Sequence, residues 1–223
     1  AHSLIPPLIQ RLYTRESLVM NASSDFILAS GSAVRAKLLS NAGVPFRAIP
    51  AEIDEDALKN AYLKNASNPS ELESLALYLA QEKAKDVSSR HPEALILGAD
   101  QILLFEGQVF NKPRDADDLR QNLKILRGKT HQLINGTTLF RDRDEIWSQT
   151  KTCRLTMRDF SDAFIDSYIE AMGDSVLACV GGYQFEAMSV QLFDHVDGDY
   201  FTILGLPVLD LMDPLRNAGV LAT

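Results

Sequence analysis

Residues Leu95-Ile96-Leu97-Gly98-Ala99-Asp100-Gln101 contain the pattern that decides the fold, a short and wholly apolar run that ends in a carboxylate. A run of this length between turn-forming residues predicts a buried strand. A buried strand that ends in an acidic residue is one way for an α/β protein to present an acid or a base. We therefore expect the strand to end at Asp100, with residues 102–105 continuing extended toward a turn at Glu106-Gly107.

The composition limits the classes of function. The chain has 223 residues, of which 46% are hydrophobic and 23% charged, as expected for a globular protein with a sizeable core. Its formal charge of -8 argues against a nucleic-acid polymer as partner, because phosphate backbones select basic surfaces, although a single nucleotide needs only a few local cations. The two cysteines, Cys153 and Cys179, form no CxxC or zinc pattern and fit a reducing compartment. No apolar run approaches membrane-spanning length, and residues 1–20 lack the apolar core of a signal peptide, so we expect a cytoplasmic protein with no membrane partner.

Alternating strand and helix patterns predict an α/β fold: a mixed, twisted sheet flanked by helices, in two lobes with a cleft between them. Residues 25–223 are expected to form one domain. Residues 1–24 are expected to be an N-terminal extension, either a tag remnant, a disordered segment or an upstream native segment. The expected strands are residues 26–29, 44–49, 95–100 and 189–193, with a hairpin of residues 132–140 and 145–157.

Local signals predict where several helices begin and end. Gly43 predicts a left-handed cap for a helix over residues 33–41. Ser70 and Glu73 predict a capping box at the start of the next helix. Three further helices are predicted to begin at Asp115, at Ser161 and at Leu206-Pro207, the first of them running to Leu126 and closed by Gly128.

Ser30-Gly31-Ser32, followed by Arg35, lies at a predicted junction between a strand and a helix. Free N–H groups at a helix N-terminus, two hydroxyl groups and a guanidinium would together bind a triphosphate. Taken alone, the segment is better explained as an ordinary capped helix with a surface arginine, because no Walker-type lysine follows.

Two other groups of charged residues have a functional and a simpler interpretation. Divalent cations prefer carboxylate and phosphate oxygens, so an acidic segment past the second strand suggests a metal site, although a solvated helix start also has this composition. Lys83 and Lys112 are candidate phosphate ligands, although each one alone fits a surface lysine. The acidic segment consists of Glu52, Asp54, Glu55 and Asp56.

Eight short motifs follow one another along the chain, and their order resembles that of the Maf family of nucleoside triphosphate pyrophosphatases, once described as septum-formation inhibitors. The resemblance extends from about Phe26 to Leu215 and implies a Maf/ITPase-like fold. The motifs are Ile27-Leu28-Ala29-Ser30-Gly31-Ser32 with Arg35 and Leu38-Leu39, Ile53-Asp54-Glu55, Ala80-Gln81-Glu82-Lys83-Ala84, Leu97-Gly98-Ala99-Asp100-Gln101, Asn111-Lys112-Pro113, Gly128-Lys129-Thr130-His131, Gly198-Asp199-Tyr200 and Leu204-Gly205-Leu206-Pro207.

The resemblance implies hydrolysis between the α- and β-phosphates of a nucleoside triphosphate, which gives a nucleoside monophosphate and pyrophosphate. It implies that Asp100 accepts the proton of the attacking water, or shares a Mg²⁺ or Mn²⁺ ion with Glu55. A homodimer is expected from the resemblance alone. Phosphate charge would be neutralised by Arg35, Lys83 and Lys112, and the phosphates would be positioned by Ser30 and Ser32.

The residues expected to read the base resemble the branch of the family that acts on 7-methyl-GTP. Gln101 follows the aspartate where the pyrimidine branch has threonine, and the Cys179–Glu186 segment occupies the late motif. The Glu186 carboxylate could accept from both N1–H and N2–H₂ of guanine. Val34 stands where this branch has a tryptophan, and losing a cation–π contact of roughly 1–2 kcal/mol would cost about tenfold in preference for the methylated base.

We therefore expect a pyrophosphatase for 7-methyl-GTP or a related modified guanine nucleotide, a house-cleaning activity of nucleotide metabolism. Four alternatives remain at this stage. They are a pyrophosphatase for dTTP and UTP, a non-catalytic nucleotide-binding regulator of cell division, a different metal-dependent phosphatase that releases orthophosphate, and a structural or scaffolding protein.

Overall fold

The computed structural model describes residues 25–223, and the predicted extension at residues 1–24 lies outside the described residues. One mixed sheet has the strand order β2-β1-β3-β5-β6-β7, with β4 paired to β3. Strand β1 is parallel to β2 and β3, whereas the other pairs are antiparallel. The strands are β1 (Phe26–Leu28), β2 (Arg47–Ala48), β3 (Leu95–Phe105), β4 (Gln108–Phe110), β5 (Thr130–Arg141), β6 (Asp144–Met157) and β7 (Phe193–Asp197).

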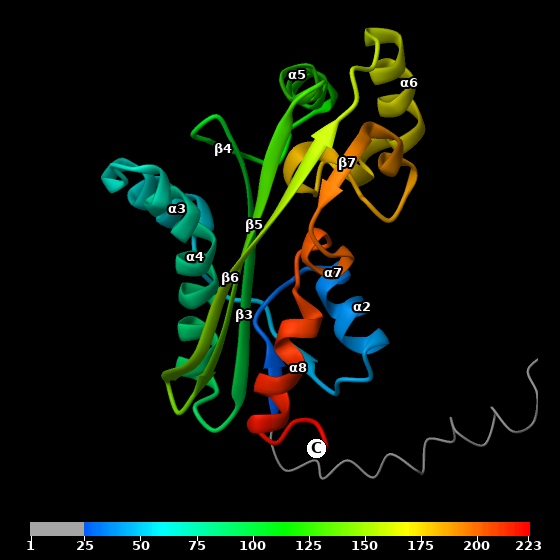
Figure 1. Cartoon of the computed structure of the whole chain (residues 1–223). Helices are drawn as coiled ribbons and strands as arrows, with labels where there is room; N and C mark the ends of the chain where they lie inside the picture. The colour runs from blue at the N-terminus through cyan, green and yellow to red at the C-terminus, as the bar shows by residue number, and fades with distance from the viewer. Residues whose placement is uncertain (1–24) are drawn as a thin grey trace, which may run out of the picture.

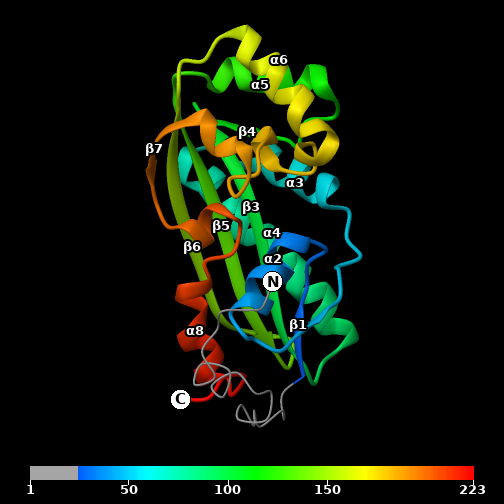
Figure 2. The ribbon, with the colours of Figure 1, turned by 90° about the vertical axis from the view of Figure 1, so that its right-hand side faces the viewer.

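Helices cover both faces of this sheet. Figure 1 shows α3 and α4 on one side of the long strands and α2, α7 and α8 on the other, while Figure 2 shows α5 and α6 together at one end. No helix in residues 25–223 is long and apolar enough to cross a membrane. The helices are α2 (Ala33–Asn41), α3 (Glu55–Asn65), α4 (Pro69–Arg90), α5 (Ala116–Leu126), α6 (Asp162–Met172), α7 (Tyr200–Ile203) and α8 (Val208–Asn217), with 3-10 turns η2 (Gly173–Val176), η3 (Val180–Gly182) and η4 (Met188–Leu192).

The side chains of β3 alternate between the two faces and divide the core into separate clusters. On one face, Leu95 and Leu97 pack in a cluster with α2 and α8, whereas Leu103 belongs to a cluster with α5 and α6. On the other face, Ile96 and Ile102 also belong to two different clusters, both beneath α4. The apolar core is therefore divided near the middle of β3, and Asp100 and Gln101 lie at this division.

Two glycines allow α4 to approach the sheet closely. A Cβ atom on Gly98 of β3 would lie 2.1 Å from the Ala80 carbonyl oxygen, and one on Gly136 of β5 would lie 2.2 Å from the Leu77 nitrogen. These distances are too short for any side chain, so the backbone of α4 rests directly on the two strands. This close packing brings Lys83 of α4 next to β3.

Several local predictions are confirmed. Helix α2 covers residues 33–41 as expected, and Gly43 has the predicted left-handed conformation, with φ of 70°. Asp115 and Ser161 accept hydrogen bonds from the first turns of α5 and α6, respectively. The hairpin of β5 and β6 also forms, with its turn at Asp142-Arg143. These features depend on neighbouring residues, which is why the sequence pattern could predict them.

Other boundaries were predicted wrongly. Strand β3 does not end at Asp100 but continues to Phe105, because β5 pairs with it along nearly its whole length. Helix α4 is capped by Asn68 and not by Ser70, and the backbone N–H of Ser67 donates to Glu71 in place of the expected Glu73. The second strand covers only Arg47–Ala48 of the predicted residues 44–49. The strand expected at residues 189–193 is instead the turn η4, and β7 follows it.

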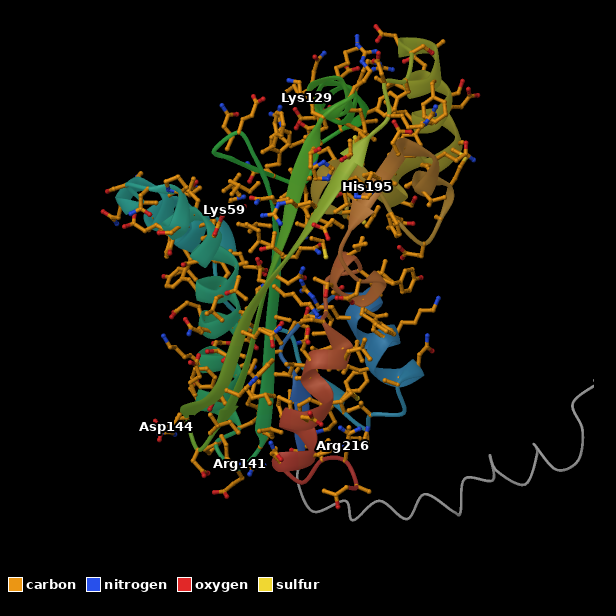
Figure 3. All side chains as sticks on the ribbon, in the orientation of Figure 1. Lys59, Lys129, Arg141, Asp144, His195 and Arg216 are labelled. Carbon is orange, nitrogen blue, oxygen red and sulfur yellow. The ribbon has the colours of Figure 1, made fainter. Side chains whose placement is uncertain are left out.

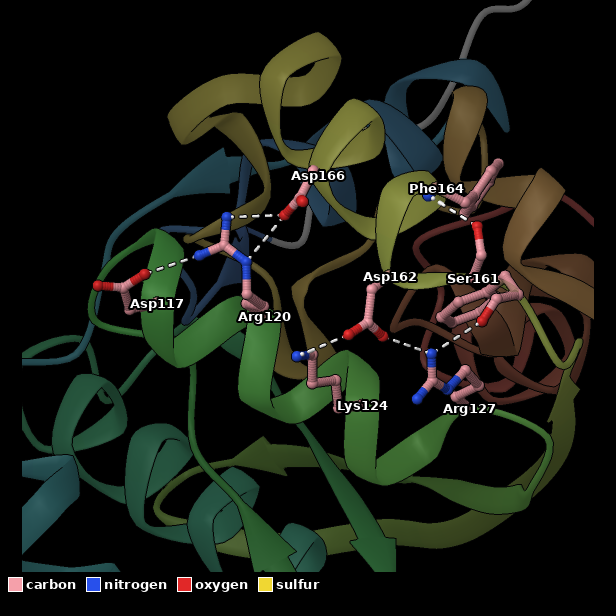
Figure 4. Close-up of polar contacts among 9 residues, drawn as sticks. Asp117, Arg120, Lys124, Arg127, Ser161, Asp162, Phe164 and Asp166 are labelled. Carbon is pink, nitrogen blue, oxygen red and sulfur yellow. Dashed lines mark hydrogen bonds and ion pairs between the residues drawn. The ribbon is translucent and has the colours of Figure 1, made fainter.

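Ion pairs join α5 to α6 at the far end of the sheet, as Figure 4 shows. Arg120 of α5 pairs with Asp166 of α6 at 2.9 Å, and Asp162 pairs with Lys124 at 3.0 Å and with Arg127 at 2.7 Å. These charges surround an apolar contact that includes Leu123 and Ile165. They help to hold the two helices together, and they lie on different elements from the residues predicted to act on a phosphate.

Candidate active site

The predicted site residues gather where β3 has a neighbouring strand on one side only. On this edge β1 pairs with residues 95–97 of β3, and β4 pairs with residues 103–105. Residues 98–102 therefore lie between the two shorter strands, while β5 pairs with them on the other side. Ligands of α/β proteins commonly bind where strands end in this way, because side chains from both faces of the sheet can reach the same space.

A lysine from α4 joins two carboxylates at this edge. The Nζ atom of Lys83 lies 2.6 Å from Oδ1 of Asp100 and 2.8 Å from Oε2 of Glu55, the first residue of α3. Lys83 and Asp100 are only 6% and 8% exposed, whereas the side chain of Glu55 is 53% exposed. The cluster is thus buried against the sheet and accessible to solvent at Glu55.

The segment after β1 contributes a second cation. Ser32 caps α2 and accepts from the backbone N–H of Arg35 at 3.3 Å, as the sequence predicted for an ordinary helix start. The guanidinium of Arg35, however, is buried and donates from Nη1 to Oγ of Ser30 at 3.2 Å and from Nε to the Gly205 carbonyl at 2.8 Å. Burial lowers the pKa of Arg35, and the negative charges of Asp100 and Glu55 oppose this shift. Arg35 is therefore not a surface residue but a fixed charge that the two carboxylates partly stabilise.

Gln101, which was expected to read the base, makes its hydrogen bonds inside the protein. Its Nε2 atom lies 3.3 Å from Oδ1 of Asn135 and 3.2 and 3.1 Å from the carbonyl oxygens of Thr202 and Ile203. Asn135 Nδ2 also donates to the Thr202 carbonyl, at 3.0 Å. Gln101 and Asn135 thus hold the end of α7, and the Gly205 carbonyl that accepts from Arg35 follows directly.

The Gly198-Asp199-Tyr200 motif fixes the beginning of the same short helix. Asp199 accepts from the backbone N–H of Thr202 at 2.9 Å and from its hydroxyl at 2.5 Å. Lys151 of β6 lies 3.1 Å from the Asp199 carboxylate and also pairs with Asp210 of α8. Burial raises the pKa of Asp199, but the hydrogen bonds from Thr202 and Lys151 outweigh it and leave this pKa below its ordinary value. Both ends of α7 are therefore fixed by charged or amide side chains.

The structure does not bring every predicted residue into this cluster. Lys112 is exposed and forms no ion pair with any residue between 25 and 223. Glu186 is also exposed, in the segment between η3 and η4. Val34 is half-buried and packs against the core beside α2. Burial raises the pKa of the Cys179 thiol, a hydrogen bond with Gln184 opposes the shift, and Glu186 raises and Lys112 lowers this pKa further, so Glu186 and Lys112 both lie within electrostatic range of Cys179.

Two residues that contact the site were not predicted from the sequence. Asn135 is fully buried in β5, and Lys59 of α3 donates to the side chain of Asn111. An asparagine directly after Leu133 and Ile134, inside a predicted strand, was a signal that could have identified the first. Lys59 gave no such signal, because its partner is far away in the sequence.

Comparisons with known proteins identify the family of this chain. A family model described as Maf-like protein matches residues 25–218. The nucleoside triphosphate pyrophosphatase of Ruegeria sp. (strain TM1040) is 43% identical to the chain, over 89% of this chain and 98% of that protein. The 7-methyl-GTP pyrophosphatase of Rhizobium meliloti (strain 1021) is 42% identical, over 87% of this chain and 96% of that protein. Among solved structures, a HAM1 protein from Coxiella burnetii covers 61% of this chain and 74% of its own, with 12% identity and a TM-score of 0.38, too weak a likeness to carry an argument.

Proposed function

This chain belongs to the Maf-like protein family, and on that premise we propose that it hydrolyses a nucleoside triphosphate between the α- and β-phosphates. The chain is a nucleotide pyrophosphatase, a hydrolase acting on acid anhydrides. The observation that carries the proposal is the contact of Lys83 with both Asp100 and Glu55 at the unpaired edge of β3. In this contact a buried carboxylate, a cation and a solvent-accessible carboxylate lie together, as a proton acceptor beside a phosphate site would require.

Each residue of the site has its own role in the proposed phosphoryl chemistry. Asp100 is the buried carboxylate that accepts the proton of the attacking water. Lys83 and Arg35 are fixed cations beside it, and positive charge that is already in place stabilises the charge that develops on the phosphates. Ser30 and the N-terminus of α2 add a hydroxyl group and backbone N–H groups that suit a phosphate oxygen.

Asp100 and Glu55 are also the residues that would hold a divalent metal. Within residues 25–223 no group of three or more His, Cys, Asp or Glu side chains is arranged as a complete metal site. Two carboxylates nevertheless fit Mg²⁺ or Mn²⁺, because such ions commonly take the rest of their ligands from substrate phosphates and water. When bound, the ion would lower the pKa of a coordinated water and neutralise phosphate charge.

We propose a guanine-type base, with 7-methyl-GTP or a related modified nucleotide as substrate. Nε2 of Gln101 is already bonded to Asn135 and α7, and we therefore assign the reading of the base to Glu186. Its exposed carboxylate can accept from N1–H and N2–H₂ of guanine, whereas thymine and uracil offer one such donor. Val34 packs against the core and provides no aromatic surface, so selectivity for the methylated ring is expected to be modest.

The test is a comparison of pyrophosphate release from 7-methyl-GTP, GTP, dTTP, UTP, CTP and ATP in the presence of Mg²⁺. The Asp100→Asn variant should lose at least about 100-fold in turnover, because it lacks the proton acceptor. The Glu186→Gln variant should lose about tenfold in preference for guanine nucleotides, since a hydrogen bond to a charged group contributes roughly 1.5–3 kcal/mol. Glu170→Gln, at an exposed carboxylate on α6, is the matched control.

Three outcomes would contradict the proposal in different ways. Faster cleavage of UTP than of every guanine nucleotide would exclude the assignment of Glu186. Release of orthophosphate in place of pyrophosphate would exclude cleavage between the α- and β-phosphates. Unchanged turnover in Asp100→Asn would exclude Asp100 as the proton acceptor.

A further inference from the structure

Lys59 connects the helix that carries Glu55 with the segment between β4 and α5 that carries Lys112. It lies one turn after Glu55 on α3, a spacing that places both side chains on the same face of the helix. Its Nζ atom donates to Oδ1 of Asn111 and lies 3.5 Å from the carbonyl oxygen of Phe110, at the end of β4. Figure 3 shows Lys59 beside α3, where that helix faces the strands.

The surroundings of Lys59 differ from those of an ordinary surface lysine. The residue is half-buried, and burial lowers its pKa, while the negative charges of Asp100 and Asp56 oppose the shift. Lys59 is therefore within electrostatic range of the catalytic carboxylate. Lys64, at the end of the same helix, is exposed and forms no ion pair with any residue that the structure describes.

The contacts of the other cations show why the contact between Lys59 and Asn111 is important. Lys83 is paired with two carboxylates, and Arg35 is held by Ser30 and the Gly205 carbonyl. Lys112 has no ion pair within residues 25–223, and its backbone neighbour Asn111 is the group that Lys59 holds. The contact between Lys59 and Asn111 therefore connects the segment of Lys112 with the helix that carries Glu55.

We propose that Lys59 is a positioning residue, which fixes the Asn111–Lys112 segment against α3 and so sets the place of the Lys112 ammonium beside the polyphosphate. The inference rests on the proposed phosphate site. It adds a connection between two site residues that lie on different elements of the fold. Lys59 does this through its hydrogen bonds to Asn111 and Phe110, and it need not touch the nucleotide.

The test compares Lys59→Met, Lys59→Arg, Lys112→Met and the double variant Lys59→Met/Lys112→Met, with Lys64→Met as the matched control. Lys59→Met should lower kcat/KM by about 10- to 100-fold, the value of one hydrogen bond from a charged group, and Lys59→Arg should restore much of it. If Lys59 acts through Lys112, adding Lys59→Met to Lys112→Met should cost less than about twofold more. Lys64→Met should match the unmodified protein.

A second readout separates this inference from the proposed function. Binding of inorganic tripolyphosphate, measured by calorimetry, does not depend on hydrolysis. Weaker binding in Lys59→Met that is absent in Lys64→Met would support the inference, even if no nucleotide released pyrophosphate and the proposed function failed. Equal binding and equal kcat/KM in Lys59→Met, or losses that simply add in the double variant, would overturn it.

Discussion

Replacing Asn135 with leucine should weaken the site without touching any residue that contacts the nucleotide. The side chain is fully buried, donates to the Thr202 carbonyl at 3.0 Å and accepts from Gln101 at 3.3 Å. Leucine has a similar volume but makes neither hydrogen bond. Of the side-chain hydrogen bonds to the Thr202 and Ile203 carbonyls, only those from Gln101 would remain, so the Gly205 carbonyl that accepts from Arg35 would be held less firmly.

The magnitude follows from these contacts. Two lost hydrogen bonds at roughly 0.5–1.5 kcal/mol each lower the free energy of unfolding by about 2 kcal/mol. For a chain of this size, that corresponds to a decrease of about 4–8 °C in Tm. Weakening the charge-assisted bond from Arg35 to Gly205, at roughly 1.5–3 kcal/mol, should lower kcat/KM by about 10- to 100-fold.

Thermal unfolding and steady-state pyrophosphate release would measure the two effects, with Thr137→Val as the control. Thr137 is on the same strand and face, is equally buried, and its hydroxyl has no hydrogen-bond partner within the described chain. Thr137→Val should therefore keep both Tm and kcat/KM. If Asn135→Leu unfolds at a lower temperature but keeps the kcat/KM of the unmodified protein, the link from β5 through α7 to Arg35 is refuted.

Two further predictions concern stability. Gly136→Ala should lower the free energy of unfolding by about 3 kcal/mol, because its Cβ would lie 2.2 Å from the backbone of α4. The control Gly107→Ala, in open space with φ of 76°, should lower it by only about 1 kcal/mol. Equal values for the two variants in denaturant unfolding would contradict this packing argument. Burial lowers the pKa of His131 to about 4, so the unfolded chain binds a proton below pH 6.5 that the folded chain does not, and stability falls as the pH decreases from 6.5 to 4. Between pH 7 and pH 4, the free energy of unfolding of His131→Gln should therefore fall by about 3 kcal/mol less than that of the unmodified protein. Parallel pH profiles of unfolding for the two proteins would exclude this effect of His131.

The sequence could predict features that depend on neighbouring residues. The extents of α2 and α5 follow from Gly43 and Asp115, which act within one turn of the helix that they end or begin. The end of β3 could not be predicted in this way, because residues 101–104 pair with residues 132–135 of β5, about thirty positions further along the chain. The same limit explains the strand expected at residues 189–193, where the apolar pattern fits a strand or a 3-10 turn equally well.

The same distinction, between what neighbouring residues determine and what distant residues determine, applies to the candidate site. The sequence by itself determined which chemical groups are available, since Asp100, Lys83, Glu55 and Arg35 were all identified from short motifs, and it determined the helix start at Ser32. Only the tertiary structure decided that one ammonium contacts two carboxylates, that Nε2 of Gln101 is already bonded, and that Lys112 forms no ion pair within residues 25–223. The physical reason is that hydrogen bonds and ion pairs form over a few ångströms in space, whereas their partners here are separated by up to 170 positions along the chain.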